Sequence, residues 1–572
     1  MKNVLHIILS SLLLGVLFFA SCKSNNSSDT SSIAKDSVSI ARGQILFNKN
    51  CSSCHNFVQD GIGPNLSGLT TKASVDWIRH FIKDPKSMIE AGDERAQELF
   101  KKYHTVMPSY ASYTDGETDT IISYLHTQNN SAKKIADKDD KALKNPIPDP
   151  IPLSDLTVGL EKVTEIPHSS EELPLTRITK IGFQPNKSDL YILDLRGKLY
   201  KLVNNEPVVY MDMAQLMPKF INQPGLATGF GSFAFHPDFE KNGLFYTTHT
   251  ESAKSQVADF KYNDTIKVQL QWVISEWKTD HPGSVPFSGK SRELFRVNMV
   301  SPIHGVQEIT FNPLSKPGDK DYGLLYIGVG DGGCVENGFP FLAHDLHNIW
   351  GTIIRIDPKG KNSTNGQYGI PSNNPFTKDA DPKILREIYA YGFRNPHRIT
   401  WTKSGKMLAS NVGQANIEEL NMILPHHDYG WPVREGTFLI NPLGDINRVY
   451  PLPADDSIYG LTYPVAQYDH DEGKAITGGF EYLGSAAPEL KGKYVFGDMN
   501  NGRVFFVNMT DVKLGKQAPI KEIQLFLNGN RVTLRQLCGR DPVDMRFGRD
   551  KEGELYVFSK ADGKVYRLIK EK

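Results

Sequence analysis

Residues 51–55 have the sequence Cys-Ser-Ser-Cys-His, and the N-terminal part of the chain is organised around them. Two cysteines two residues apart, followed at once by a histidine, form the attachment motif of a c-type haem. The spacing has a chemical reason, because each thiol forms a thioether with one porphyrin vinyl group and the adjacent histidine is then held against the iron. A redox-active dithiol would not need the histidine. We therefore predict covalent haem on Cys51 and Cys54, with His55 as an iron ligand.

A haem of this kind takes a second axial ligand, and Met107 is well placed to supply it. Met107 precedes Pro108 downstream of the attachment motif. Ligation by histidine and methionine raises the potential of the iron and suits electron transfer. The sequence also contains three rival ligands, which are otherwise ordinary helix or loop residues: His80, His104 and Met88.

The residues around the motif contain four runs with helical character, three of them with apolar residues at helical spacing. The runs are 39–48, 74–82, 94–103 and 115–127. With the turn-rich loop 61–66 between motif and Met107, this stretch resembles the class I cytochrome c domain. The resemblance implies a small all-α domain over residues 39–128 that carries one haem c. It also implies that the first helix, with Gly43 and Phe47, crosses the last helix, with Tyr124.

The chain has 572 residues, which is enough for two or three domains. Lysine plus arginine and aspartate plus glutamate both number 65, so the formal net charge is zero. Since no basic excess points to nucleic acid, we expect no nucleic-acid partner.

The first 21 residues have the pattern of an export signal. Lys2 is the charged end, residues 7–19 are an apolar core, and Ala20-Ser21 precede Cys22. This resembles the bacterial lipoprotein signal, which implies cleavage before Cys22 and a lipid on its thiol. The alternative is an ordinary secretory signal in which Cys22 is incidental. Residues 22–38 are too polar to pack and are expected to form a flexible tether.

We therefore expect a lipid-anchored protein of the bacterial cell envelope, outside the cytoplasm. It would lie on the periplasmic side of the inner or outer membrane, or on the cell surface. Haem attachment outside the cytoplasm agrees with this location. No later apolar run reaches the roughly 18 residues of a membrane span.

Residues 129–154 are rich in Pro, Lys and Asp, and their prolines alternate from Pro146 to Pro152. Alternating prolines favour an extended, semi-rigid chain. We predict a linker here and a second domain over residues 155–572.

In the second domain a pair of short strands recurs. Each copy has an apolar strand, a turn containing Pro, Asp or Gly, and a strand of the Gly-x-Leu-Tyr-Val kind. The six copies begin near residues 181, 233, 309, 399, 479 and 545. Such repetition predicts six four-stranded blades. The expected fold is thus multidomain, with a small all-α cytochrome c domain followed by an all-β six-bladed β-propeller.

Four blocks of this domain carry a resemblance. They are 233–239 (FAFHPDF), 391–397 (YGFRNPH), 418–423 (EELNMI) and 429–432 (YGWP). They resemble the quinoprotein sugar dehydrogenases, which include soluble glucose, sorbosone and aldose dehydrogenases. The resemblance implies a propeller that oxidises a sugar with pyrroloquinoline quinone and calcium. The same superfamily contains hedgehog-interacting-protein-like members without this chemistry.

The resemblance gives catalytic roles to His304 and Asp331. In the enzymes a histidine at this place removes the substrate hydroxyl proton as hydride passes to the quinone, and an aspartate hydrogen-bonds that histidine. A carboxylate fixes the tautomer of an imidazole and raises its basicity, so the pairing makes chemical sense. The alternative is that His304 is a turn residue and Asp331 only ends a strand.

Cofactor contacts are implied in the same way. Arg394 and Asn395 match a family pair that holds the quinone, and a planar guanidinium suits carboxylates. The alternative for Arg394 is a salt bridge between blades. Gly413 and Gln414 fall where the family offers two backbone carbonyls to calcium, which prefers oxygen donors. Where the family has further basic residues on its last blades, this chain has Asn500, Asn501 and Arg503, with Arg540 nearby.

Three other patterns point elsewhere or stay open. Residues 328–333 fit G-x-G-x-x-G, but no helical pattern follows, so a nucleotide site is not predicted. The loop histidines at 344, 347, 426 and 427 lack the spacing of a zinc site. A disulfide between Cys334 and Cys538 would suit an oxidising compartment.

Two functions follow from this sequence. The first is an oxidoreductase that oxidises a sugar, or a related alcohol or aldehyde, and passes electrons to its haem and then to an acceptor in the periplasm or membrane. The second is a propeller that binds a glycan or protein partner without catalysis, beside a cytochrome that serves electron transfer only.

Overall fold

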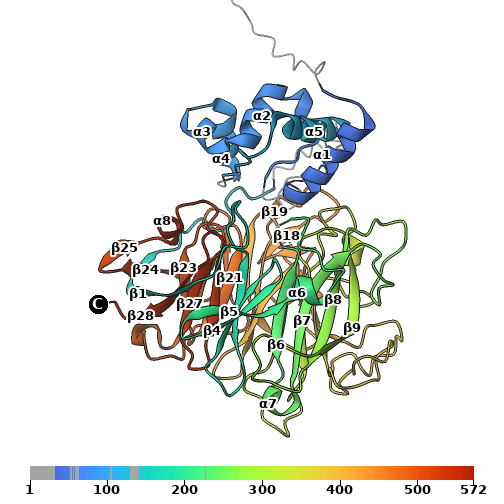
Figure 1. Cartoon of the computed structure of the whole chain (residues 1–572), viewed down its shortest axis with the longest axis vertical. Coiled ribbons are helices and arrows are strands. Elements are labelled where there is room, and N and C mark those ends of the chain that lie inside the picture. The colour runs from blue at the N-terminus through green and yellow to red at the C-terminus, as the bar shows by residue number, and fades with distance from the viewer. Residues whose placement is uncertain are drawn as a thin grey trace, which may run out of the picture.

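The computed structural model describes residues 33–51, 55, 57, 63–103, 106–107, 109–128, 141–225 and 227–571. A helical domain is seated on one end of a β-propeller (Figure 1). The export signal, Cys22 and Cys54 lie outside the described residues, so the predictions for them stay predictions.

The helical domain contains five α-helices within the described residues. They are α1 (Ser37–Asn50), α2 (Val75–Lys83), α3 (Pro85–Glu90), α4 (Glu94–Tyr103) and α5 (Asp115–Thr127). Four of them match the predicted runs to within two residues at each end. The short α3 was not predicted, because six residues are too few to show a helical period. Thr114 caps α5 in a reciprocal capping box with Glu117.

Helices α1 and α5 cross in close contact, as the resemblance to cytochrome c implied. A Cβ atom on Gly43 would lie 1.8 Å from the carbonyl oxygen of Thr120, so only glycine allows this approach. Beside the crossing, the rings of Phe47 and Tyr124 lie 5.4 Å apart between centroids. Both helices thus bury their apolar faces in the small core of this domain.

The propeller consists of six four-stranded blades. Blade 1 contains β2 (Ile178–Phe183), β3 (Leu190–Asp194), β4 (Lys198–Val203) and β5 (Glu206–Asp212), and blade 2 contains β6 (Phe230–Phe235), β7 (Leu244–Ser252), β8 (Leu270–Lys278) and β9 (Lys290–Met299). Blade 3 contains β10 (Glu308–Phe311), β11 (Leu325–Val329), β12 (Thr352–Ile356) and β13 (Ile388–Tyr391), and blade 4 contains β14 (Pro396–Trp401), β15 (Met407–Asn411), β16 (Ile417–Ile423) and β20 (Ala466–Asp469). Blade 5 contains β21 (Ile476–Glu481), β22 (Lys493–Asp498), β23 (Val504–Asn508) and β24 (Lys521–Leu527), and blade 6 contains β26 (Met545–Arg549), β27 (Leu555–Ser559), β28 (Lys564–Ile569) and β1 (Leu153–Glu165).

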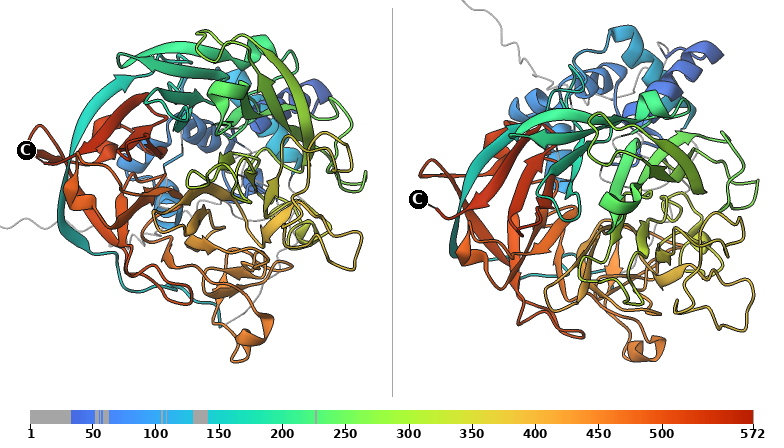
Figure 2. Two further views of the ribbon diagram at one scale, coloured as in Figure 1. Left: turned by 90° about the horizontal axis from the view of Figure 1, so that it is seen from below. Right: turned by 60° about the horizontal axis from the view of Figure 1, so that its bottom comes forward.

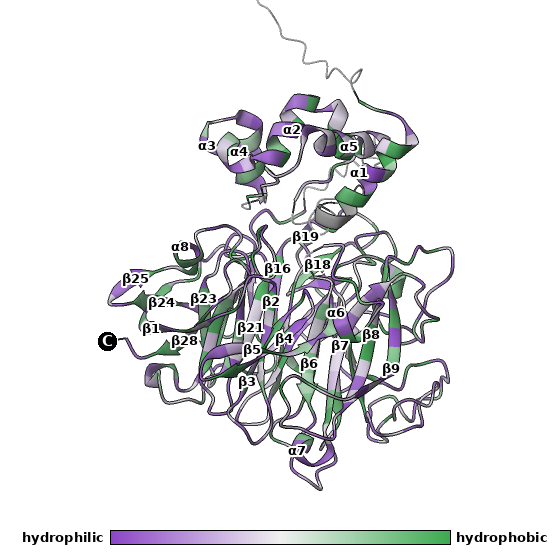
Figure 3. Cartoon of the chain, in the orientation of Figure 1, coloured by the Kyte–Doolittle hydropathy of each residue, from purple (hydrophilic) through white to green (hydrophobic). Residues whose placement is uncertain are grey.

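Each predicted repeat copy forms the two inner strands of one blade, so the predicted six-bladed propeller is confirmed. The apolar residues follow the strands, while many connecting loops are hydrophilic (Figure 3). Smaller elements decorate the ring. They are α6 (Met213–Leu216), α7 (Phe239–Asn242), α8 (Leu534–Cys538), β25 (Asn530–Val532) and the small sheet of β17 (Arg434–Glu435), β18 (Phe438–Ile440) and β19 (Val449–Tyr450).

The ring is closed by its first strand. β1 pairs antiparallel with β28, with Leu160 opposite Leu568, and also parallel with β24. Figure 2 shows β1 running beside the C-terminal strands. Blade 6 is therefore built from both ends of the propeller, and its hydrogen bonds hold the ring shut.

The linker is attached to the propeller over the part that the structure describes. The amide of Leu143 donates to the carbonyl of Val449 at 2.9 Å. The amide of Ile147 donates to the Asp469 carboxylate at 3.1 Å. These bonds tie the chain to β19 of the small sheet and to the end of β20 in blade 4, just before β1 begins. Within the described ranges, none of the helices has the length and apolar character needed to cross a membrane.

Candidate functional site

A cavity of about 770 Å³ lies between the two domains. His304 and Arg394 line it from the propeller, while His55, Phe57 and Tyr103 line it from the helical domain. The propeller residues come from segments at one end of the central channel, and the helical domain covers that end (Figure 1). The two sets of predicted site residues therefore face one shared space.

The helical domain has its own apolar cavity, of about 210 Å³, lined by Cys51, His55 and Met107. The Nδ1 atom of His55 lies 2.9 Å from the Pro64 carbonyl oxygen. This bond places the proton on Nδ1 and gives Nε2 the lone pair that a metal ligand needs. A Cβ atom on Gly63 would lie only 2.3 Å from the His55 ring, so glycine keeps this side of the ring clear.

These residues fit a haem, because the wall is apolar and both predicted ligands face the same space. Among the rival ligands, His80 and Met88 do not line the cavity, and His80 bonds the Asp76 carbonyl on its own helix. His104 lies outside the described residues. His55 also lines the inter-domain cavity, so the haem site and the propeller site are adjacent.

His304 and Asp331 come together at the propeller side of the inter-domain cavity. The Nδ1 atom of His304 lies 2.8 Å from Oδ1 of Asp331. The Gly333 amide donates to the same oxygen at 2.8 Å, and the Trp431 indole donates to Oδ2 at 3.0 Å. Burial opposes ionisation of Asp331, but His304, the charge of Arg394 and the Gly333 amide outweigh it and lower the pKa of the carboxyl group. An ionised Asp331 fixes the proton of His304 on Nδ1 and leaves Nε2 as the basic atom.

The backbone around this pair is tightly interlocked. His304 has a φ of +49°, a conformation that is unfavourable for a residue with a side chain. A Cβ atom on Gly330 would lie 2.3 Å from the His304 carbonyl oxygen, and the Gly332 amide donates to that oxygen at 3.1 Å. The glycine at 330 in the G-x-G-x-x-G pattern thus leaves space for the His304 loop. The turn after β11 does not lead directly into an α-helix, as a nucleotide-binding site would require.

Arg394 is the centre of a second group of contacts. Its Nε donates to the Gln414 side chain at 3.0 Å, and Nη1 donates to the Gly413 carbonyl at 2.5 Å. Nη2 forms an ion pair with Glu336, which the sequence analysis did not single out. The guanidinium also lies 5.8 Å from the ring centroid of Trp431, the residue that bonds Asp331. The predicted catalytic pair and the predicted quinone arginine are therefore joined through one tryptophan.

The same contacts bear on calcium. The Gly413 carbonyl, which the resemblance offers to calcium, here accepts a hydrogen bond from the cationic Arg394. Among the described residues no group of three or more His, Cys, Asp or Glu side chains is arranged to hold a metal ion. Calcium at Gly413 and Gln414 stays a prediction, and the ion would have to share the Gly413 carbonyl oxygen with Arg394 or displace it.

Buried glutamates hold the loop that carries Gly413. One oxygen of Glu435 accepts four backbone amides, from residues 414 to 417, at 2.7–3.1 Å. Glu418 accepts the Gly413 amide at 3.2 Å and lies 3.0 Å from Nε2 of His470. Burial raises the pKa of Glu418 to about 8 and lowers that of His470 to about 4. Burial thus disfavours the charged form of both side chains, and the hydrogen bonds of Glu435 and Glu418 hold the loop in place.

The cavity wall carries more basic residues than the sequence analysis identified. The basic residues are Lys102, Lys144, Arg394, Lys474, Arg546 and Lys560, against the acidic Glu336 and Asp544. Burial lowers the pKa of Lys560 to about 8. The buried Nε2 of Gln414 and Nδ1 of His397 have no hydrogen-bond partner among the described residues. This wall fits an anionic ligand with polar edges, as a quinone bearing carboxylates is.

Sequence reasoning had only weak signals for these residues. Lys474 lies two residues before β21 begins, and Arg546 lies inside β26, and neither place in the sequence shows where the side chain points. Of the residues noted instead, Asn500 lines the cavity. Arg503 forms ion pairs with Glu472 and Glu522, which is a structural role.

The remaining patterns have structural explanations. His344 pairs with Asp428 at 2.7 Å, and His347 pairs with Asp381 at 2.9 Å. Cys334 is buried with a free thiol, and Cys538 is also free, so the two do not form a disulfide in this structure.

Comparison with known families agrees with this geometry. The family described as Glucose / Sorbosone dehydrogenase matches residues 180–567, and the family described as Cytochrome c matches residues 40–129. A solved structure of a glucose dehydrogenase covers 72% of this chain and 99% of its own chain at 18% identity, with a TM-score of 0.50. That likeness supports the fold.

Curated relatives are of more than one kind. The chain is 26% identical to the HIPL1 protein of Arabidopsis thaliana, in an alignment that covers 60% of this chain and 53% of that protein. It is 24% identical to the Hedgehog-interacting protein of Mus musculus, over 67% of this chain and 48% of that protein. It is 25% identical to quinoprotein glucose dehydrogenase B of Acinetobacter calcoaceticus, over 38% of this chain and 42% of that protein. The chain spans about half the length of the curated relatives it matches.

Proposed function

Because the chain belongs to the glucose/sorbosone dehydrogenase family and carries a cytochrome c domain, we propose that it is a sugar dehydrogenase that reduces its own haem. The substrate is a sugar or a related alcohol or aldehyde, and the propeller cofactor is pyrroloquinoline quinone. The observation that carries this proposal is the inter-domain cavity, which is lined by His304 on one side and His55 on the other.

The residues of the propeller divide the chemistry among them. When bound, the quinone accepts the hydride of the substrate carbon. His304 takes the substrate hydroxyl proton at Nε2, and the ionised Asp331 stabilises the imidazolium that results. Arg394, Asn395 and Lys474 line the wall where they would hold the anionic quinone. Trp431 fixes Asp331 and packs against Arg394, so it keeps the base and the quinone site in register.

The helical domain supplies the exit for the electrons. Phe47, His55 and Tyr103 line both the haem cavity and the inter-domain cavity. A haem held by Cys51 and His55 would therefore occupy a cavity that shares these wall residues with the propeller site. A haem bound there would supply one-electron transfer to an acceptor in the periplasm or membrane.

The alternative function is a non-catalytic propeller that binds a glycan or a protein partner. One observation favours it, which is that the guanidinium of Arg394 already bonds Glu336, Gln414 and the carbonyl of Gly413. In that case the cytochrome serves electron transfer only. Purified protein separates the two functions. Wild type given quinone, calcium and an aldose, alcohol or aldehyde shows the reduced haem absorbance if it is a dehydrogenase and stays oxidised if it only binds.

We also propose that the mature protein is anchored outside the cytoplasm by a lipid on Cys22. The supporting feature is the sequence, in which small residues precede Cys22 and a polar tether follows it. Radiolabelled palmitate is expected to enter the wild type and not the Cys22→Ser variant. Cys538→Ser is the matched control and is expected to label like the wild type. Equal labelling of wild type and Cys22→Ser would reject the anchor.

A further inference from the structure

A second cavity, of about 570 Å³, lies at the other end of the propeller channel. The last residues of the inner strands line it, for example Phe183 of β2 and Trp401 of β14. The inter-domain cavity is instead lined by residues that precede or begin these strands, such as Gln307 before β10 and Ala475 before β21. The two cavities therefore open at opposite ends of the ring, and we name this one the distal cavity.

A buried group of charges forms the inner wall of the distal cavity. Lys180 of blade 1 bonds Glu308 of blade 3 at 2.7 Å, and Arg398 of blade 4 forms an ion pair with the other oxygen of Glu308. All three side chains line the distal cavity, and none of them lines the inter-domain cavity. Two cations against one carboxylate leave a positive charge on this wall. The Nε of Arg398 is buried and has no hydrogen-bond partner among the described residues.

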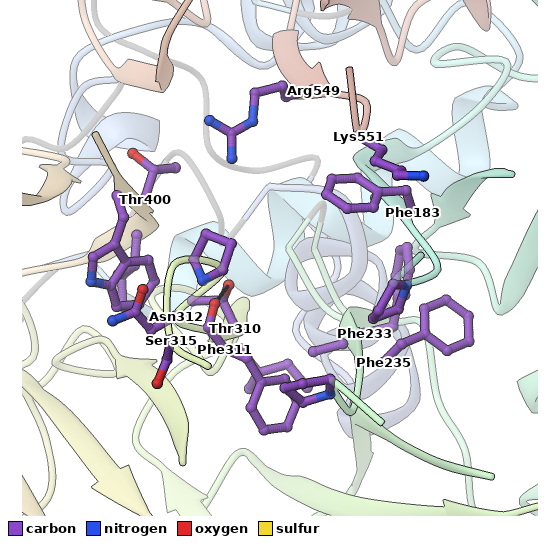
Figure 4. A pocket seen from close by; sticks show the side chains of 18 of the residues that line it. Phe183, Phe233, Phe235, Thr310, Phe311, Asn312, Ser315, Thr400, Arg549 and Lys551 are labelled. Carbon is purple, nitrogen blue, oxygen red and sulfur yellow. Dashed lines mark hydrogen bonds between the residues drawn. The ribbon is translucent and has the colours of Figure 1, made fainter. Parts of the chain in front are cut away.

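Arg549 adds a second positive group. Its guanidinium lies 5.5 Å from the ring centroid of Phe480, and its Nη1 is buried without a hydrogen-bond partner among the described residues. Figure 4 shows this guanidinium pointing into the cavity between Thr400 and Phe183. Lys551 stands at the rim and touches only the Asn186 carbonyl, at 3.4 Å, among its described hydrogen-bond partners. Arg549 forms no ion pair among the described residues, although the carboxylates of Asp550 and Glu481 are near enough to stabilise its charge. Its buried Nη1 is therefore a donor that is available to an anion.

The walls between these charges are aromatic. Phe183, Phe233, Trp401, Phe480 and Phe547 line the cavity, with the side chains of Thr310 and Ser315 among them. Figure 4 shows Phe183 and Phe233 on one side of the space and Thr310 and Phe311 on the other. The hydroxyl oxygen of Ser315 is buried and has no partner among the described residues. Flat apolar walls with a few polar groups are typical of a small-molecule site.

We propose that the distal cavity binds a small organic carboxylate with a flat body, its carboxylate on Arg549 and its body against the aromatic walls. An aromatic acid and a sugar acid share this chemistry, because both carry a carboxylate on a body that stacks on aromatic rings. This site is separate from the proposed dehydrogenase site, and it does not depend on that function.

Calorimetric titration of the full-length, haem-loaded protein tests the proposal. The probes are benzoate and glucuronate, and the neutral controls are benzyl alcohol and methyl glucoside. Wild type is expected to bind at least one carboxylate and to bind its neutral control much more weakly. Arg549→Gln is expected to weaken that binding about 10–100-fold, as loss of a charge-assisted hydrogen bond does. Arg567→Gln removes an arginine that pairs with Glu161 on the outer strands and is expected to change nothing.

A second variant guards against a folding defect in the first. Thr310→Glu keeps Arg549 and places a carboxylate in the distal cavity, so it is also expected to repel the probe. Thermal unfolding and the haem spectrum show whether each variant is intact. Arg549 does not line the inter-domain cavity, so binding that survives both substitutions belongs to that other cavity and overturns the proposal. Failure of wild type to bind either carboxylate at millimolar concentration overturns it as well. The preferred probe tells whether the body is aromatic or a sugar.

Discussion

Replacing His304 with alanine is expected to slow substrate-driven haem reduction about 10²–10⁴-fold, which is the usual loss when a general base is removed. The reason is the geometry at Asp331, whose ionised carboxylate keeps the His304 proton on Nδ1 and makes Nε2 the base. Stopped-flow absorbance of the haem, with quinone bound and substrate added, measures this rate. Reduction of the same haem by dithionite is expected to be unchanged, because it bypasses the propeller.

Two further variants serve as controls for the His304 substitution. His281→Ala removes an exposed histidine in the loop between β8 and β9 and is expected to behave like the wild type. Asp331→Asn keeps the shape of the side chain but loses the negative charge, so it is expected to slow the reaction as well. If His304→Ala reduces its haem as fast as the wild type, the base has been assigned wrongly, even though the family is right.

Replacing both Cys51 and Cys54 with serine is expected to abolish transfer of substrate electrons to any external one-electron acceptor. The motif predicts that these thiols attach the haem, and without them His55 would hold it only through the iron. The propeller has its own core, so oxidation of substrate by a two-electron dye is expected to continue near the wild-type rate. The measurements are denatured mass, which loses the haem increment, and paired assays with the dye and with a one-electron acceptor.

Cys538→Ser is the matched control for the thiol substitutions. Cys538 lies at the end of α8 with a free thiol, and it lines neither the haem cavity nor the inter-domain cavity. Its replacement is expected to leave both assays unchanged. A double serine variant that still delivers substrate electrons to the one-electron acceptor at the wild-type rate would show that the haem is not the exit.

The features that the sequence predicted well are local in the chain. The haem motif is five consecutive residues, and each blade is indicated by two adjacent strands and the turn between them. Gly43 and Tyr124 are an exception, since they lie on different helices and were paired only through the resemblance to cytochrome c. The two helices can touch here because Gly43 has no Cβ atom. The sequence shows the glycine, but it does not show which helix lies against it.

The features that the sequence missed depend on contacts between distant segments. β1 pairs with β28 some four hundred residues later, and nothing within β1 indicates that partner. The ion pair with Arg394 identifies Glu336 as a site residue, and its position in the cavity wall identifies Lys474 as one. Neither contact is apparent in the sequence. A charged residue in a loop has no periodic pattern that tells where its side chain points. The position of the helical domain over the propeller also depends on contacts between distant segments, so the sequence does not predict it.

The concentration dependence of haem reduction shows whether the propeller reduces the haem of its own chain. Protein loaded with quinone is mixed with substrate in a stopped-flow instrument, and the haem absorbance is followed over a wide range of protein concentration. If the propeller reduces the haem of its own chain across the shared cavity, the observed rate constant is the same at every protein concentration. A rate constant that rises in proportion to protein concentration would mean that electrons pass between molecules. No reduction with any aldose, alcohol or aldehyde would contradict the dehydrogenase itself.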